Sequence, residues 1–249
     1  MADTRVAAAC SAAAGPIENI GATWMLDPAQ HEISKNSGYA HEFMGYMAGR
    51  GGVLGEVDAS IVNSVFGVFE PGVVDMLWNG GRPVHGAKGG SELYFSQAAD
   101  WGRKKLANTA STARIVELGE KIINAAPTLG LPLFVGWKNL PRVDDSGGRA
   151  MQVLLVLREL RGSIHLAAVA AHGLTPVEAH LLNKGPEYCA FFGWPEPYPS
   201  VDHLKGKKDE IEEVTNTRVA EIVASALSAE EAEELAGYTS AINDAIGMK

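Results

Sequence analysis

The chain has 249 residues, of which 46% are hydrophobic and 20% are charged. This composition provides enough apolar surface for a folded core, in one large domain or two small ones, and excludes a largely disordered protein. The formal net charge is −9, and both halves of the chain are acidic. Binding to DNA would therefore require a local basic patch.

The cysteines and the N-terminus indicate where the protein works. Two cysteines, Cys10 and Cys189, cannot supply a disulfide framework or a cysteine metal cluster, which favours a reducing compartment. The alanine-rich N-terminus lacks the basic start and continuous apolar run of a signal peptide, and no apolar stretch reaches membrane-spanning length. We therefore expect a cytoplasmic protein with no membrane partner.

The first half of the chain predicts helices separated by glycine-rich or polar breaks. Residues 1–24 are small and alanine-rich and are expected to be a flexible segment, and a helical unit follows over residues 25–126. Asp27 and Pro28 mark its first helix, because aspartate caps free amides and proline suits the first helical position. The expected helices cover residues 28–48 with an interruption near Ser37, 59–69, 71–78, and 91–126 with a break near 108–111. The glycine-rich residues 79–90 predict a loop.

Residues 127–148 form a long connection rich in proline and glycine, which is either a crossing between two domains or a lid over a pocket. The C-terminal unit, residues 149–249, opens with a helix over 149–161 that is apolar nearly all round and therefore buried. A second helix ends at Gly173, and a capping box at Thr175 opens a third, which gives a helix-turn-helix order. A short hairpin is expected within residues 197–210. We thus predict a mainly α, multi-helical fold of tandem helix-turn-helix or winged-helix-like units around a central buried helix.

Several polar residues of the C-terminal unit have structural explanations. His165 and His172 are seven residues apart, so about 10 Å separates them along a helix and they cannot share a metal ion; no metal site is predicted. Glu178 is explained by the capping box, and His172 by the dipole at a helix end.

Arg161 and His165 are the stronger candidates for function. They lie one helical turn apart beside the most apolar helix of the chain, where an unpaired charge would be costly. Arg161 therefore needs a partner, which Glu159, Glu178 or Glu212 could supply. The pair is either a buried network that joins helices or a site that faces a ligand.

DNA recognition makes a separate demand on the helix-turn-helix. Its second helix normally presents arginine, lysine, asparagine or glutamine to base edges. Here that helix offers Glu178, His180, Asn183 and Lys184. The only concentrated basic run contains Lys205, Lys207 and Lys208, and acidic residues follow it directly. DNA as a partner is therefore disfavoured but stays open.

A set of segments distributed along the chain resembles a known family. The segments are MGYMAGRGGVLGEV (44–57), VFGVFEPGVVDMLW (65–78), LLVLRELRGSIHLAAVAAHGL (154–174), EAHLLNKG (178–185), FGW (192–194) and IEEVTN (211–216). Together they resemble an actinobacterial family that is labelled helix-turn-helix and has no assigned function, over roughly residues 25–245. The resemblance implies a mostly helical fold of tandem winged-helix-like units, and its motif positions here are Tyr46, Arg50, Trp78, Arg161, His165 and Thr215.

This chain departs from the family pattern at three positions. Leu160 and Ser163 stand where the family has a histidine and an aspartate, and Asn216 stands where it has an aspartate. An activity that depends on those side chains is therefore not expected here.

Three classes of function follow. The first is a small-molecule-binding protein of specialised metabolism, which could be a cofactor-independent lyase, isomerase or cyclase. His165 would be its general acid or base, and Arg161 or Arg50 would hold a carboxylate or enolate oxygen. The residues expected to bind the ligand are Arg50, Tyr46, His41 and Trp78. No nucleotide fingerprint, P-loop or nucleophile elbow is present, so no cofactor is expected.

The second class is a ligand-responsive transcription regulator, and the third is a non-catalytic protein that sequesters a ligand or confers resistance. The third class shares the pocket of the first and differs from it only in turnover. A homodimer is compatible with each class.

Overall fold

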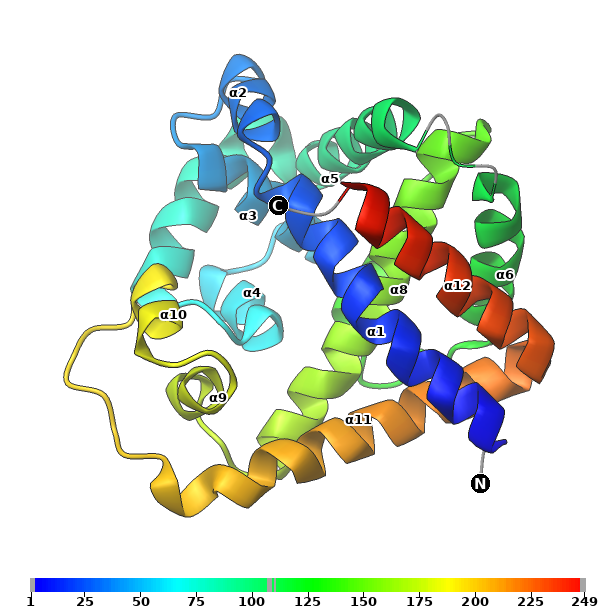
Figure 1. Ribbon diagram of the computed structural model, residues 1–249. Coiled ribbons are helices and arrows are strands. Elements are labelled where there is room, and N and C mark those ends of the chain that lie inside the picture. Colours follow the sequence, from blue (N-terminus) through cyan, green and yellow to red (C-terminus); the bar gives the residue numbers. More distant parts are fainter. Residues whose placement is uncertain (1–2, 107–108, 110, 247–249) are drawn as a thin grey trace.

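The computed structural model describes residues 3–106, 109 and 111–246, and this part of the chain folds into helices without a single strand (Figure 1). The first half contains α1 (Thr4–Met25), α2 (Pro28–Asn36), α3 (Glu42–Gly51), η1 (Gly52–Leu54), α4 (Ala59–Phe66), α5 (Pro71–Lys105) and α6 (Thr112–Ala125). The second half contains α7 (Pro132–Lys138), α8 (Ser146–Ala171), α9 (Pro176–Asn183), α10 (Pro186–Phe191), η2 (Asp202–Leu204), α11 (Lys205–Ala226) and α12 (Ala229–Ile246). The predicted mainly α fold is confirmed.

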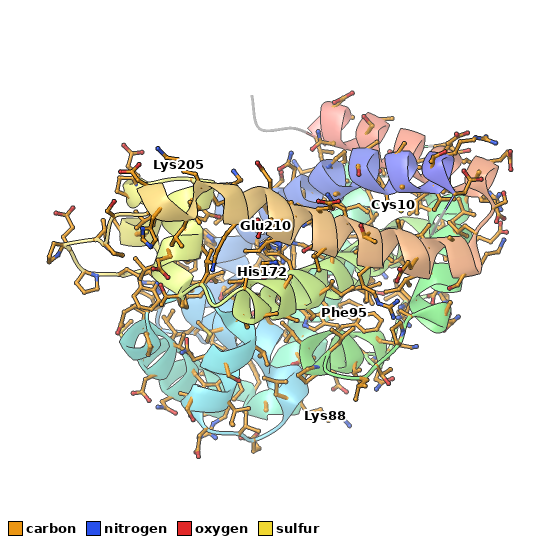
Figure 2. The ribbon with its side chains drawn as sticks, turned by 90° about the horizontal axis from the view of Figure 1, so that it is seen from below. Cys10, Lys88, Phe95, His172, Lys205 and Glu210 are labelled. Atoms are coloured by element: carbon orange, nitrogen blue, oxygen red, sulfur yellow. The ribbon has the colours of Figure 1, made fainter. Side chains whose placement is uncertain are left out.

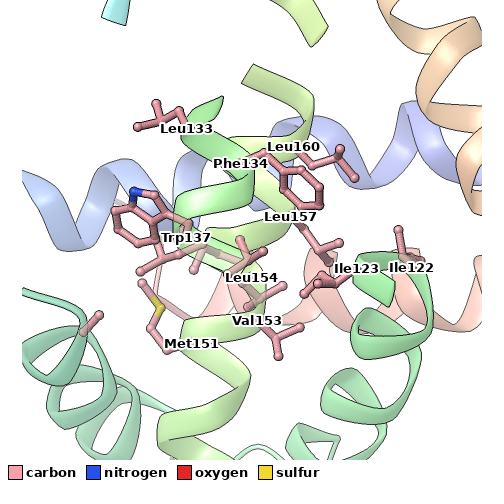
Figure 3. Close-up of a cluster of buried hydrophobic side chains, with 14 of the residues drawn as sticks. Ile122, Ile123, Leu133, Phe134, Trp137, Met151, Val153, Leu154, Leu157 and Leu160 are labelled. Atoms are coloured by element: carbon pink, nitrogen blue, oxygen red, sulfur yellow. The ribbon is translucent and has the colours of Figure 1, made fainter. Parts of the chain in front are cut away.

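Helix α8 is the central helix, as its apolar sequence predicted. Asp145 caps it by accepting a hydrogen bond from the amide of Gly148 at 2.8 Å. Residues 150–157 are all buried, and α8 packs against α1, α5, α6, α7 and α11 (Figure 1). Figure 3 shows one part of this core, where side chains of α8 meet those of α6 and α7. The two predicted units therefore contribute to one continuous hydrophobic cluster.

The predicted end of this helix near Gly162 is wrong. Helix α8 continues through Gly162 to Ala171. A glycine in the interior of a helix costs only about 1 kcal/mol relative to alanine, and the burial of α8 on both sides of this position outweighs that cost. The predicted capping box is confirmed, because the Thr175 amide donates to the Glu178 carboxylate at 2.8 Å and the Glu178 amide donates to the Thr175 hydroxyl oxygen at 3.3 Å.

The expectation that residues 1–24 are flexible is wrong for the described residues. They form α1, which lies alongside α12 and runs in the same direction (Figure 1). Arg5, at the start of α1, donates hydrogen bonds to Glu230 and Glu233, at the start of α12. The buried side of α1 consists of Val6, Ala9, Ala13, Ile20 and Trp24. Their helical spacing is concealed in the sequence by the surrounding alanines.

The loop predicted over residues 79–90 is also wrong, because these residues belong to α5. Only Gly86, with φ 71°, departs from helical geometry and kinks the helix. The glycines of this region serve close packing: a Cβ on Gly81 would lie 2.6 Å from the carbonyl oxygen of Met44, and one on Gly52 would lie 2.1 Å from that of Ala87. Helix α3 and η1 therefore press directly against the backbone of α5.

Two further segments differ from their predictions. Residues 127–148 contain the short helix α7, whose Trp137 side chain is fully buried and donates to the carbonyl oxygen of Arg50 at 3.1 Å. Residues 197–210 contain η2 and the start of α11 in place of the expected hairpin. Among the described residues, no helix combines the length and the hydrophobicity that crossing a membrane requires.

Candidate functional site

A cavity of about 350 Å³ lies within the helices, bounded mainly by α1, α8, α9 and α11. Its lining changes along its length. The aliphatic lobe, on the side of α6 and α12, is lined by Ala9, Ala13, Ile122, Val223, Ala232 and Leu235. The aromatic lobe, on the side of α4, α9 and α10, is lined by Tyr46, Phe66, His180, Tyr188 and Phe192. Figure 1 shows α6 and α12 on one side of α8 and α4, α9 and α10 on the other.

Between the lobes, the lining is charged. This polar centre consists of Glu18 from α1, Arg50 from α3, Arg158, Arg161 and His165 from α8, and Glu212 from α11. The sequence predicted four residues that reach the cavity: Tyr46, Arg50, Arg161 and His165. The fold thus brings together residues that lie more than 100 positions apart in the chain.

The first part of the polar centre is a buried ion-pair network. Arg50 donates from Nε and Nη2 to the two carboxylate oxygens of Glu159 at 2.8 and 3.0 Å, and from Nη1 to the hydroxyl of Tyr46 at 2.9 Å. Arg158 donates to Glu159 at 3.2 Å and to Glu18 at 2.8 Å. Burial opposes the charge of Arg50, but the neighbouring Glu159 outweighs it and raises the pKa of Arg50. Arg50 therefore stays charged, and each of its three guanidinium nitrogens donates to a side chain of the protein.

Local sequence makes room for this network. A Cβ on Gly21 of α1 would lie 2.5 Å from Cδ of Arg158, so glycine allows the arginine to pass under α1 to Glu18. The guanidinium of Arg50 lies over the ring of Phe66, 4.4 Å from its centroid. Such stacking stabilises a cation in an apolar setting. The helices α1, α3, α4 and α8 are thereby joined at one point.

The second part of the polar centre contains Arg161 and His165. Arg161 donates from Nη2 to Glu212 at 2.7 Å and to Asn216 at 3.2 Å. Glu212 is thus the partner among the three that the sequence suggested. The Nε atom of Arg161 is buried without a hydrogen-bond partner in the described part of the chain. An unpaired buried donor is costly, so this arginine retains capacity for an acceptor that the protein does not supply.

The surroundings of His165 determine which ring nitrogen carries its proton. Nδ1 lies 3.4 Å from Oγ1 of Thr215 and 3.6 Å from Oε1 of Glu212. Thr215 donates its own hydroxyl proton to the carbonyl of Ile211 at 2.7 Å, so toward His165 it accepts. Both neighbours of Nδ1 are acceptors, which places the proton on Nδ1 and leaves Nε2 with a free lone pair. Burial lowers the pKa of His165, which favours this neutral form.

The aromatic lobe is held together by ring contacts. His180 stacks on Phe192 with centroids 4.9 Å apart, and its Nε2 donates to the carbonyl of Val68 at 2.7 Å. Burial lowers the pKa of His180, which supports this neutral ring. At the rim, Lys184 lies over the ring of Tyr188, 4.8 Å from its centroid. The predicted third helix of the C-terminal unit therefore turns its histidine inward.

Two residues predicted to bind the ligand do not reach the cavity. His41 is exposed and caps α3, because its Nδ1 accepts a hydrogen bond from the amide of Phe43 at 3.2 Å. Trp78 is fully buried on α5 and donates to the carbonyl of Val57 at 2.9 Å. Each of these side chains is hydrogen-bonded to a backbone group and does not line the cavity. The sequence in turn missed Glu18, because α1 was expected to be flexible.

Metal binding and the basic run are two further features that could accompany the cavity. The described residues contain no group of three or more histidine, cysteine, aspartate or glutamate side chains placed to hold a metal ion. Lys205 pairs with Asp202 at 2.7 Å, and Lys207 donates to the carbonyl of His172 at the end of α8 at 2.7 Å (Figure 2 labels Lys205 and His172). The basic run is thus partly used inside the fold.

Comparison with known proteins defines the class of this chain. A model of a helix-turn-helix family matches residues 10–198. The chain therefore belongs to this helix-turn-helix family. No curated protein and no solved structure matches it.

Proposed function

We propose that this protein binds a small organic molecule in the cavity between α1, α8 and α11. One observation carries the proposal: a cavity of about 350 Å³ with apolar lobes contains two arginines, Arg158 and Arg161, whose Nε atoms are buried without a hydrogen-bond partner among the described residues. Sites for small molecules are mostly apolar concavities with a few polar groups that fix orientation. Of the groups predicted from the sequence, Tyr46 and His165 lie at the same cavity and offer a hydroxyl and a ring nitrogen.

The same groups support a cofactor-independent proton transfer in specialised metabolism. His165, neutral with a free Nε2, would accept a proton from the ligand, and Arg161 would stabilise the negative charge that develops on an oxygen. Without turnover, the same cavity would serve a sequestering or resistance protein. Conversion of a bound ligand by the wild type, together with binding but no conversion by His165→Gln, would favour the enzyme.

The test of binding is native mass spectrometry of the protein after exposure to a metabolite extract. We expect a reproducible organic adduct on the wild type, and its loss in Arg161→Gln with the circular dichroism spectrum unchanged. Arg218→Gln is the matched control, because Arg218 pairs with Glu221 on the exposed side of α11. A wild type that stays bare and shows no rise in melting temperature in the extract would refute the proposal.

Ligand-responsive regulation of transcription is the second candidate, and the helix-turn-helix family favours it. Helices α8 and α9 are joined by the short turn around Gly173, in the order that this motif uses. Against it, His180 points inward and Glu178 is used for capping. Binding to random duplex DNA at low salt, which weakens steeply as salt rises, is the expected result for a regulator. Absent binding would exclude it.

A further inference from the structure

We infer that the ligand of this cavity is a hydrophobic monocarboxylate with an aliphatic chain. Its carboxylate would bind Arg161 in the polar centre, and its chain would lie in the aliphatic lobe. This inference rests on the proposed function and specifies the class of ligand.

The charge balance around the cavity supports a single negative charge. Four cationic side chains lie at the cavity, Arg50, Arg158, Arg161 and Lys184. Three carboxylates pair with them or lie beside them, Glu18, Glu159 and Glu212. One positive charge is left over, although the whole chain carries a net charge of −9. The cation without a carboxylate partner is Lys184, which is exposed at the rim, so the surplus favours an anionic ligand through attraction toward the cavity and not through an unpaired buried charge.

The donors that remain free point to Arg161 as the residue that holds the anion. Arg50 is bound through Nε, Nη1 and Nη2, and Arg158 through Nη1 and Nη2, so that only the buried Nε of Arg158 lacks a partner among the described residues. Arg161 uses only Nη2, for Glu212 and Asn216. In the described part of the chain its Nε and Nη1 have no hydrogen-bond partner, and Nε is buried. A guanidinium with free N–H groups suits the oxygens of a carboxylate.

The aliphatic lobe supplies the reason for an alkyl chain. Among the described residues, its lining comprises apolar side chains from α1, α6, α8, α11 and α12 together with the thiol of Cys10. Burial raises the pKa of Cys10 to about 11, so this thiol stays uncharged. A ligand group that carried hydrogen-bond donors or acceptors would be left without partners in this lobe. An aliphatic chain has no hydrogen bonds to lose there, and the burial of its apolar surface stabilises the complex.

The length of the lobe suits a chain of moderate length. Glu212, beside the proposed carboxylate, and Val223, in the aliphatic lobe, both line the cavity from α11. Eleven residues of helix span about 16 Å at 1.5 Å per residue. The alanines Ala9 and Ala13 of α1 and Ala232 of α12 keep this space open. The aromatic lobe differs, because Tyr188 and Lys184 place polar atoms along it.

The test is isothermal titration calorimetry with three probes of equal chain length, used below their micelle concentrations. These are dodecanoate, dodecan-1-ol and dodecylammonium. We expect dodecanoate to bind at least tenfold more tightly than the alcohol, and the ammonium probe not to bind. Equal affinity for acid and alcohol would overturn the role of the negative charge. A preference for the ammonium probe would overturn it as well.

Variants show which part of the cavity holds the carboxylate of the probe and which part holds its chain. Arg161→Gln should weaken dodecanoate at least tenfold and leave dodecan-1-ol unchanged, and Arg161→Lys should retain part of the affinity. Ala13→Phe, which fills the aliphatic lobe, should weaken both probes, whereas Arg218→Gln should change neither. If Ala13→Phe is folded and binds normally, or if 2-naphthoate binds as tightly as dodecanoate, the chain does not occupy this lobe.

The two proposals can fail separately. If native mass spectrometry shows an organic adduct while no carboxylate probe binds, the monocarboxylate inference is wrong and the small-molecule function stands. If neither an adduct nor any probe binds, both are wrong.

Discussion

The ion pair between Arg50 and Glu159 gives the most quantitative test of how this core is built. The side chain of Arg50 is 8% exposed and that of Glu159 is 1% exposed. Arg50→Met removes the charge while retaining an unbranched side chain. It leaves the carboxylate of Glu159 buried with one remaining partner, Nη1 of Arg158 at 3.2 Å.

The expected cost follows from that uncompensated charge. Removal of one partner of a buried pair typically costs about 3–5 kcal/mol. Because Arg158 still contacts Glu159, we expect the lower end, about 3 kcal/mol. For a domain of this size, 1 kcal/mol lowers the melting temperature by about 2–4 °C, so the variant should melt roughly 6–12 °C below the wild type.

The double variant Arg50→Met/Glu159→Leu separates the charge from the packing. It removes both members of the pair, and Arg158 keeps Glu18 as its partner. Replacement of a buried pair by apolar side chains is often close to neutral, so the double variant should be more stable than Arg50→Met alone. Arg218→Met removes a half-exposed pair on α11 and should cost no more than about 1 kcal/mol.

The assay is urea unfolding followed by circular dichroism at one pH for the wild type, Arg50→Met, Glu159→Leu, the double variant and Arg218→Met, with the slope m checked for constancy. If Arg50→Met costs less than about 1 kcal/mol, the pair behaves as a surface pair and the buried network is refuted. Equally, a cost of the double variant that equals the sum of the two single costs would show that the charges do not interact.

Two further predictions use the same unfolding assay. Gly119→Ala should be destabilising, because the new Cβ would lie 2.2 Å from Cγ1 of Val153 on α8. The control Gly237→Ala, whose Cβ would meet nothing within 4 Å, should stabilise α12 by up to about 1 kcal/mol. Equal effects of the two substitutions would contradict the close packing of α6 on α8. Burial lowers the pKa of His165, so this histidine takes up a proton at a higher pH in the unfolded chain than in the folded one. The stability of the folded protein is therefore lost as the pH falls from about 6.5 toward the pKa of folded His165. The stability of wild type relative to His165→Gln should therefore decrease between pH 7.5 and 5.5, and a difference that stays constant or grows would show that His165 is not held neutral.

The sequence predicted those elements that carry their own local signals. The capping box at Thr175 and the cap at Asp27 involve residues a few positions apart, and the apolar run of α8 is continuous. Arg161 and His165 were predicted for a related reason, and both line the cavity. A charge beside the most apolar helix requires a partner, and that requirement can be read before the partner is known.

The sequence failed where small residues have a packing role that depends on distant elements. Glycines such as Gly52 and Gly81 resemble loop residues, yet each allows one helix to touch the backbone of another. The alanines of α1 similarly hide a buried stripe, and with it Glu18. Trp78 and His41 show the opposite error, because their chemistry suggested binding while nearby backbone groups already occupy them.

Helix α9 is the element that would link the two proposed functions, ligand binding and regulation. Pro176, Ala179 and His180 of this helix line the cavity, and α9 is also the second helix of the helix-turn-helix order. His180 fixes α9 against Val68 through one hydrogen bond of 2.7 Å. A ligand that contacts these side chains acts on the position of the helix that a regulator would use for DNA. A ligand can shift α9 only if it binds more tightly to one position of that helix than to another. The polar centre is held in place by buried ion pairs on α8, so a ligand bound there would be fixed while α9 moves. The cavity would therefore serve either ligand binding alone or ligand binding coupled to the position of α9.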